Sequence, residues 1–210
     1  MKKAFFKFAA LAMVVMGSIS IMSCEKEPDN TINGHEYVDL GLPSGLKWAT
    51  CNVGANTPEE YGNYYAWGEI IPKTDYSYEN CVTLGKQLSD ISGNASYDAA
   101  TANWGASWRM PTKEEMKELI DNCTFKWITQ NGTTGTLVTG KNGNTIFFPA
   151  NGYYFGTSYY ENALRCFYWS STNCDITSDI SSYHLDLSKE KYFVNWFMRC
   201  YGYGVRPVSD

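Results

Sequence analysis

Apolar positions follow a helical period most clearly between residues 112 and 122. Met116, Leu119 and Ile120 recur at three- and four-residue spacing, which places them on one face of a helix with charged residues around them. Thr112 stands where the helix begins, and the glutamate three residues later completes the sequence of a capping box. The pattern predicts an amphipathic helix with a structural role, and we place no catalytic group on it.

A period of two, which is typical of strands, dominates the C-terminal half. Its clearest case is Tyr183, Leu185 and Leu187, which alternate with His184 and Asp186. Asn-Gly pairs between apolar runs indicate tight hairpins, because both residues tolerate positive φ. Strands are expected at residues 35–40, 46–52, 62–67, 125–129, 136–139, 145–148, 183–187 and 192–197.

The order of these elements predicts a fold class. A second, shorter helix is expected over residues 98–104, and strands lie before and after the two helices. We therefore expect one antiparallel α+β domain over residues 35–210, a length that suits a single sizeable core. Residues 69–97 are polar, contain proline and show no period, so they are expected to form a long loop. Loops of this length are usually functional or poorly ordered.

The N-terminal residues have the pattern of an export signal. Three lysines precede or enter an apolar run that ends at Ile21 and is too short for an ordinary membrane-spanning helix. A serine before Cys24 resembles a bacterial lipobox. The pattern predicts a lipoprotein signal peptide at residues 1–23, an acylated Cys24 carrying palmitate-type chains, and a polar tether at residues 24–34. An ordinary secretory signal is the alternative.

The predicted lipoprotein signal also predicts where the protein lies in the cell. A lipid anchor at Cys24 places it on the outer membrane of a Gram-negative bacterium, and the acidic residues that follow favour its outer surface. The chain has 17 lysines and arginines against 22 aspartates and glutamates. Such an acidic domain does not bind nucleic acid or an anionic membrane through its charge, so the acyl chains would make the membrane contact.

Five segments occur in order over residues 35–208: VDLGLPSGLKWATCNVGA, EYGNYYAWGE, ANWGASWRMPTKEEMKEL, YWSS and GVRPV. Together they resemble the Fibrobacter succinogenes major paralogous domain family. The resemblance implies a fold similar to C-type lectin-like domains, near the formylglycine-generating enzymes. Two helices would pack beside a twisted antiparallel sheet, and long loops would form a ligand- or partner-facing side. Members of the family are typical of secreted and cell-surface bacterial proteins.

The residues of a calcium-dependent sugar site are missing from the domain. The nearest string to its Glu-Pro-Asn motif is Glu-Pro-Asp in the tether. Asn173, Asp175 and Asp179 are interpreted as solvated loop residues, because calcium takes six to eight oxygen ligands and no spaced loop motif is present. Neither histidine stands at ligand spacing from another ligand, so no zinc site or other cofactor is predicted.

Six cysteines remain beyond the lipobox: Cys51, Cys81, Cys123, Cys166, Cys174 and Cys200. In an exported protein they are disulfide candidates or inert buried thiols, and the sequence does not choose among their pairings. Formylglycine-generating enzymes hold copper with a cysteine pair near the C-terminus, but the residues around these cysteines do not match that motif. A copper-dependent oxidase is the least favoured function, and no catalytic residue is assigned.

Aromatic residues are the best guide to function. Most of the sixteen tyrosines and seven tryptophans must form the core, and we expect Trp104 and Trp108 to be buried beside the start of the helix. Four tyrosines lie in polar segments without a period, and at least part of this set is expected to be exposed together as a recognition patch: Tyr76, Tyr78, Tyr159 and Tyr160. They favour a non-catalytic binding or adhesion module for a glycan or protein ligand. A structural component of the envelope is the alternative.

Overall fold

The computed structural model describes residues 30–177 and 179–210. Its strands are β1 (Thr31–Ile32), β2 (His35–Asp39), β3 (Lys47–Ala49), β4 (Thr124–Gln130), β5 (Thr133–Thr139), β6 (Thr145–Pro149), β7 (Tyr153–Phe155), β8 (Ser158–Tyr160), β9 (Arg165–Asn173), β10 (Ser181–Ser188), β11 (Tyr192–Met198) and β12 (Val208–Ser209). The helices are α1 (Ala99–Trp104), α2 (Lys113–Asn122) and the single 3-10 turn η1 (Asp175–Thr177). The predicted signal peptide, Cys24 and most of the tether lie outside the described residues.

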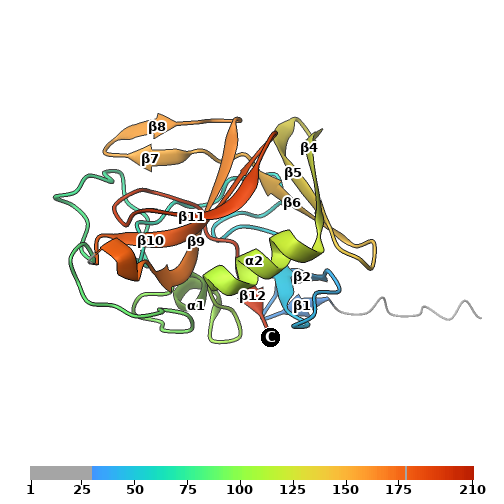
Figure 1. Ribbon diagram of the computed structural model, residues 1–210, viewed down its shortest axis with the longest axis horizontal. Coiled ribbons are helices and arrows are strands. Elements are labelled where there is room, and N and C mark those ends of the chain that lie inside the picture. Colours follow the sequence, from blue (N-terminus) through green and yellow to red (C-terminus); the bar gives the residue numbers. More distant parts are fainter. Residues whose placement is uncertain (1–29, 178) are drawn as a thin grey trace, which may run out of the picture.

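The predicted α+β, C-type lectin-like fold class is wrong, because the described chain is mainly β. Its strands form four small antiparallel sheets, with the orders β1-β2-β3-β12, β11-β10-β9, β4-β5-β6 and β7-β8. The two α-helices have only six and ten residues. Glycine- and asparagine-rich turns interrupt the strands so often that no single sheet exists for a pair of helices to cover (Figure 1).

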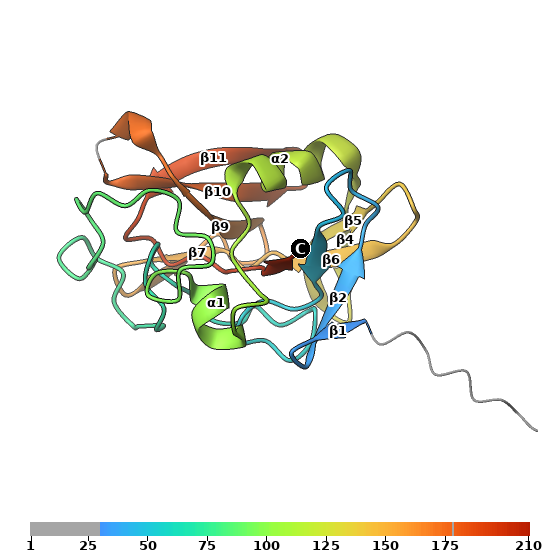
Figure 2. The ribbon, with the colours of Figure 1, turned by 90° about the horizontal axis from the view of Figure 1, so that it is seen from below.

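The two predicted helices themselves are confirmed. The Thr112 hydroxyl accepts from the Glu115 amide and the Glu115 carboxylate accepts from the Thr112 amide, which completes the capping box of α2. Asp98 caps α1 by accepting from the amides of Ala100 and Thr101. Figure 2 shows α2 along the β9–β10–β11 sheet, which it contacts through all three strands.

The Asn-Gly hairpin was also predicted correctly. Gln130 pairs with Thr133, so Asn131 and Gly132 alone form the turn between β4 and β5. Their φ angles are 46° and 85°, the positive values that a two-residue hairpin needs. In contrast, the strand expected at residues 62–67 is reduced to a single bridge between Tyr65 and Tyr203.

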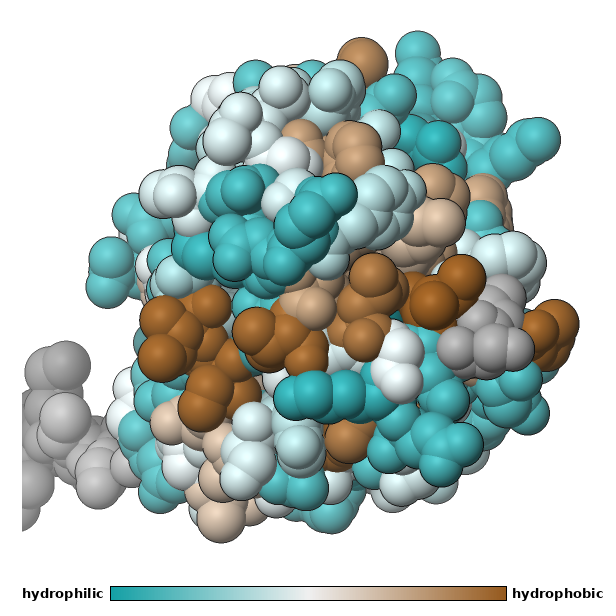
Figure 3. All heavy atoms as spheres, turned by 90° about the vertical axis from the view of Figure 1, so that its left-hand side faces the viewer, coloured by the Kyte–Doolittle hydropathy of each residue, from teal (hydrophilic) through white to brown (hydrophobic). Residues whose placement is uncertain are grey.

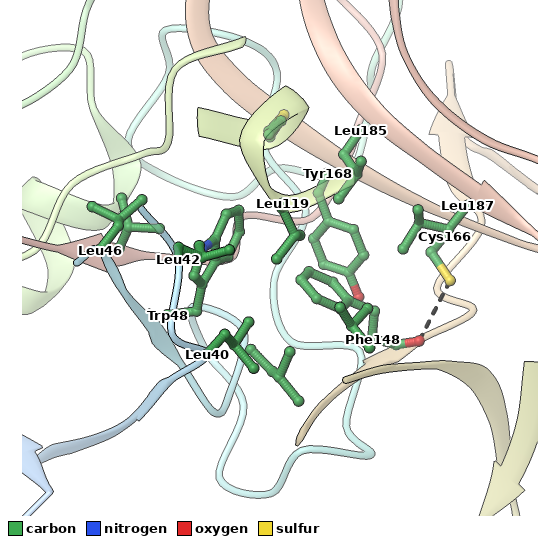
Figure 4. Packing of buried hydrophobic residues seen from close by; sticks show 14 of the residues in the cluster. Leu40, Leu42, Leu46, Trp48, Leu119, Phe148, Cys166, Tyr168, Leu185 and Leu187 are labelled. Atoms are coloured by element: carbon green, nitrogen blue, oxygen red, sulfur yellow. Dashed lines mark hydrogen bonds between the residues drawn. The ribbon is translucent and has the colours of Figure 1, made fainter. Parts of the chain in front are cut away.

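The core lies in two clusters on opposite faces of the central β-structure. The first is packed between α2 and the strands β3, β6, β9 and β10, and includes Trp48, Leu119 and Tyr168 (Figure 4). The second contains Trp67, Trp169 and parts of α1. β9 separates them, because successive side chains on a strand point to opposite faces.

The long loop expected at residues 69–97 is confirmed, since no helix or strand lies within it. It is nevertheless anchored to the rest of the domain. Tyr76 and Ile91 are buried, and the Ile91 amide donates to the Ser171 carbonyl. The loop therefore packs as part of the domain.

Candidate functional site

One face of the β9–β10–β11 sheet forms the floor of a pocket. His184 on β10 pairs in register with Asn195 on β11, and Asp186 pairs with Phe167 on β9. Directly paired residues in an antiparallel sheet point to the same face, so these side chains are neighbours. The intervening residues, such as Leu185, point to the opposite face and enter the first core cluster. The sheet thus presents polar and aromatic groups on one side and an apolar face on the other.

We call this hollow, of about 180 Å³, the aromatic pocket. Five of its lining residues carry aromatic rings: Tyr153, Phe167, Phe197, Tyr201 and Tyr203. Five are polar or charged: Glu161, Arg165, His184, Asp186 and Asn195. The pocket is thus lined in equal parts by ring surfaces and by hydrogen-bonding groups.

The aromatic rings contact each other around the pocket. The ring centroid of Tyr153, on β7, lies 5.2 Å from that of Phe167 and 5.4 Å from that of Tyr201. Phe197 meets Tyr201 edge to face at 4.6 Å. Such packing holds each ring in place, so its exposed surface is available to a ligand at a small entropic cost. Burial also raises the pKa of Tyr201 to about 12, which keeps its hydroxyl protonated and able to donate.

Arg165 and Asp186 form a two-point ion pair in the floor. The Arg165 Nε lies 3.0 Å from the Asp186 Oδ1, and Nη2 donates to the other carboxylate oxygen. Burial raises the pKa of Asp186, while the hydrogen bonds and charge of Arg165 lower it. The guanidinium also lies over the Phe167 ring, 5.1 Å from its centroid. The pair fixes both side chains and leaves little net charge between them.

His184 is a buried neutral base in this floor. It is 2% exposed, and its Nδ1 has no hydrogen-bond partner among the described residues. Burial and, to a smaller extent, the nearby Arg165 charge lower the pKa of His184 to about 3. Imidazole nitrogens are strong hydrogen-bonding groups, and a buried one without a partner is uncommon. Among the described residues that line the pocket, this nitrogen is the one buried side-chain polar atom without a hydrogen-bond partner.

Of the four tyrosines from which an exposed patch was expected, the structure exposes two. Tyr76 is buried at 2% exposure, and its hydroxyl donates to the Tyr64 carbonyl at 2.7 Å. Tyr159 is half-buried and donates to the Asn151 carbonyl. Only Tyr78 and Tyr160 are exposed. Tyr76 was misassigned because a polar neighbourhood in sequence does not reveal that the folded loop packs its ring against Gly202.

The two exposed tyrosines nevertheless border the aromatic pocket. Tyr160 stacks on Tyr153 at 5.3 Å. Tyr78 contacts Phe155, which stacks on Tyr201 at 4.7 Å. Sequence reasoning missed the pocket itself, although the alternation of His184 and Asp186 with leucines already marked two polar groups on one strand face. Which other strands would supply rings to that face could not be read from the chain.

The cysteines do not lie at this site. In the described part of the chain, no disulfide joins Cys51, Cys81, Cys123, Cys166 or Cys200, and Cys174 is buried. Burial raises the pKa of Cys166 and Cys200 to about 12, so neither thiol ionises readily at neutral pH. Within residues 30–177 and 179–210 no three His, Cys, Asp or Glu side chains are arranged to hold a metal ion.

A second surface feature is an apolar band on the side of the molecule that carries the 69–97 loop and η1 (Figure 3). The exposed apolar residues of these and adjoining segments are Ile71, Val82, Ile176 and Ile180. Exposed apolar patches often mark contact surfaces. The band lacks the convergent polar groups of the aromatic pocket.

None of the helices in the described residues is long and apolar enough to cross a bilayer.

Comparisons of the chain with models of protein families, with curated proteins and with solved structures gave no match. The resemblance to the major paralogous domain family therefore stays a prediction from the five segments quoted above. The pocket must be interpreted from its own geometry.

Proposed function

We propose that this protein is a non-catalytic binding or adhesion module, held on the outer membrane by lipid at Cys24, and that the aromatic pocket is its ligand site. The observation that carries the proposal is the convergence of five rings and five hydrogen-bonding side chains on one small hollow. Binding sites for small ligands combine apolar walls with a few placed polar groups in this way.

Two properties of the pocket support binding rather than chemistry. Both carboxylate oxygens of Asp186 accept hydrogen bonds from Arg165, so this carboxylate is poorly suited to act as a general base. His184 has a pKa of about 3, far below the value near neutral pH that makes an efficient proton shuttle. The side chains of Asp186 and His184 are therefore suited to hydrogen bonding without a change in their protonation.

An array of glycans and host proteins, probed with the full-length chain in detergent, tests this proposal. We expect a ligand whose affinity falls by about 1 kcal/mol or more in Asn195→Ala and in Phe197→Ala. Trp196→Ala is the matched control. Trp196 lies between them on the opposite face of β11 and is 42% exposed, close to the 40% of Phe197.

Binding that weakens equally in all three variants would place the site elsewhere. If the wild-type chain binds nothing on a broad array, the result would instead favour a structural envelope component without a specific ligand.

A further inference from the structure

We infer that the aromatic pocket takes one neutral sugar ring, the terminal unit of a glycan chain. This inference rests on the proposed function and names the ligand class of that same site. It follows from the size of the pocket, the pairing of ring surfaces with hydrogen-bonding groups, and the charge balance.

The size of the hollow limits the ligand to a small group. At about 180 Å³ it is smaller than the roughly 300–1,000 Å³ of pockets that enclose a drug-sized molecule. It borders a second, more open hollow of about 580 Å³, with which it shares Glu161 and Arg165. Leu164, 63% exposed, lines that second hollow. One ring fits the pocket, and the rest of a chain has a path outward.

The ring surfaces match the apolar face of a pyranose. A sugar ring carries C–H groups on its faces, and these pack against the electron-rich face of an aromatic ring. Phe197 is 40% exposed at the mouth, while Tyr153 and Tyr201 are half-buried beside it. Their mutual packing fixes them before a ligand arrives.

The polar groups match sugar hydroxyls, each of which both donates and accepts. Asn195 is exposed and offers an amide with both functions. Its register partner His184 is buried, and its Nδ1 has neither a hydrogen-bond partner among the described residues nor exposed surface. The protonated Tyr201 hydroxyl adds a further donor and acceptor. Neighbouring hydroxyls of one ring would meet neighbouring groups of one sheet face.

The charges of the pocket disfavour ionic ligands. His184 is neutral and Arg165 is paired with Asp186, so Glu161 leaves the site slightly negative and repels an acidic sugar. A ligand cation would find the face of the Phe167 ring already covered by the Arg165 guanidinium. An uncharged ring meets neither obstacle.

Saturation-transfer NMR on the full-length chain in detergent tests this inference. The probes are the methyl glycosides of glucose, galactose, mannose, xylose and N-acetylglucosamine. The methyl glycoside of galacturonic acid, as its sodium salt, and choline are the charged comparisons. We expect transfer from aromatic protons to the C–H protons of at least one neutral glycoside. Its Kd should rise about tenfold or more in Asn195→Ala and Phe197→Ala and stay within twofold in Trp196→Ala.

The inference falls if no neutral glycoside receives saturation, or if galacturonate or choline binds as tightly as the best neutral sugar. The proposed function survives that result when the array yields a different ligand whose binding depends on Asn195 and Phe197. If no ligand of any class depends on these two residues, the inference and the proposed function fall together.

Discussion

Two buried arginines of this protein, Arg199 and Arg206, make their hydrogen bonds to neutral groups. Arg206 is fully buried, yet its guanidinium donates to one side-chain amide and three carbonyls, those of Asn52, Ala49, Thr50 and Phe147. These bonds connect the end of β3 and the segment after it to the middle of β6. From the sequence alone, an arginine is expected to lie on the surface, because charged residues are seldom fully buried without a partner. The structural role of Arg206 can be recognised only from the hydrogen-bond partners that the fold brings to it.

His184 should make the fold sensitive to acid. Its pKa is lowered from the 6.5 of a free histidine to about 3, so the folded state binds this proton less readily than the unfolded state. The stabilising contribution of the neutral imidazole is complete above pH 6.5 and is lost as the pH falls towards 3. Within that window we expect a loss of up to about 1.4 kcal/mol per pH unit. Urea unfolding from pH 7 to 4 measures it.

The variant His184→Gln should show a shallower pH dependence over the same range. Arg165 and Asp186 face this histidine and are retained in the variant, so the difference between the two slopes isolates the imidazole. His35→Gln is the matched control, because His35 is half-buried against Trp104 and should change the slope less. Parallel curves for wild type and His184→Gln would show that this group does not cause the acid sensitivity.

At the scale of elements, local sequence signals were reliable where the partners are close in the chain. The start of α2 depends on residues three apart, and the β4–β5 turn depends on two adjacent residues. The expected strand at residues 62–67 failed because a strand needs a partner along its length, and this segment meets Tyr203 at one bridge only. Pairing of strands is a property of the fold and not of the segment.

The cap of α2 should contribute measurably to stability. Glu115 holds the Thr112 amide and also forms a two-point pair with Arg109, with distances of 2.8 and 2.7 Å. We expect Thr112→Ala to lower the free energy of unfolding by about 1 kcal/mol, because the first-turn amide loses its acceptor. Thr112→Ser should restore most of that loss. Urea unfolding at pH 7 measures both.

Lys117→Ala provides the comparison on the exposed face of the same helix. The Lys117 side chain is 73% exposed and pairs with Asp121 at 3.7 Å, an arrangement that contributes little in water. If Thr112→Ala were no less stable than Lys117→Ala, the capping box would have no energetic role.

At the scale of the whole molecule, we predict that the location of the domain in the cell depends on the N-terminal signal. We predict that Cys24→Ala abolishes acylation, because the thiol is the only attachment point that the lipobox pattern offers, and that the protein then leaves the membrane fraction. Fractionation of cells with immunoblotting measures this. Ser23→Ala, which keeps a small residue before the cysteine, should be processed and anchored normally. A Cys24→Ala protein that stays membrane-bound would contradict the lipid anchor.

The sequence by itself determined the features that depend on neighbours in the chain. It located both helices, the α2 cap, the Asn-Gly hairpin and the alternation that puts His184 and Asp186 on one face of β10. Of the two tryptophans expected to be buried, Trp108 has no exposed surface, whereas Trp104 is only half-buried. These signals are local because a helix turn or a hairpin closes within a few residues.

Only the tertiary structure decided which strands pair, how the sheets divide and which aromatic residues meet. The pocket takes Tyr153 from β7, Arg165 and Phe167 from β9, His184 from β10 and Tyr203 from the segment before β12. Similar tyrosines ended in opposite environments, since Tyr76 is buried and Tyr160 is exposed. Burial is set by residues distant in the chain, so neither the fold class nor the composition of the site could be derived from local pattern.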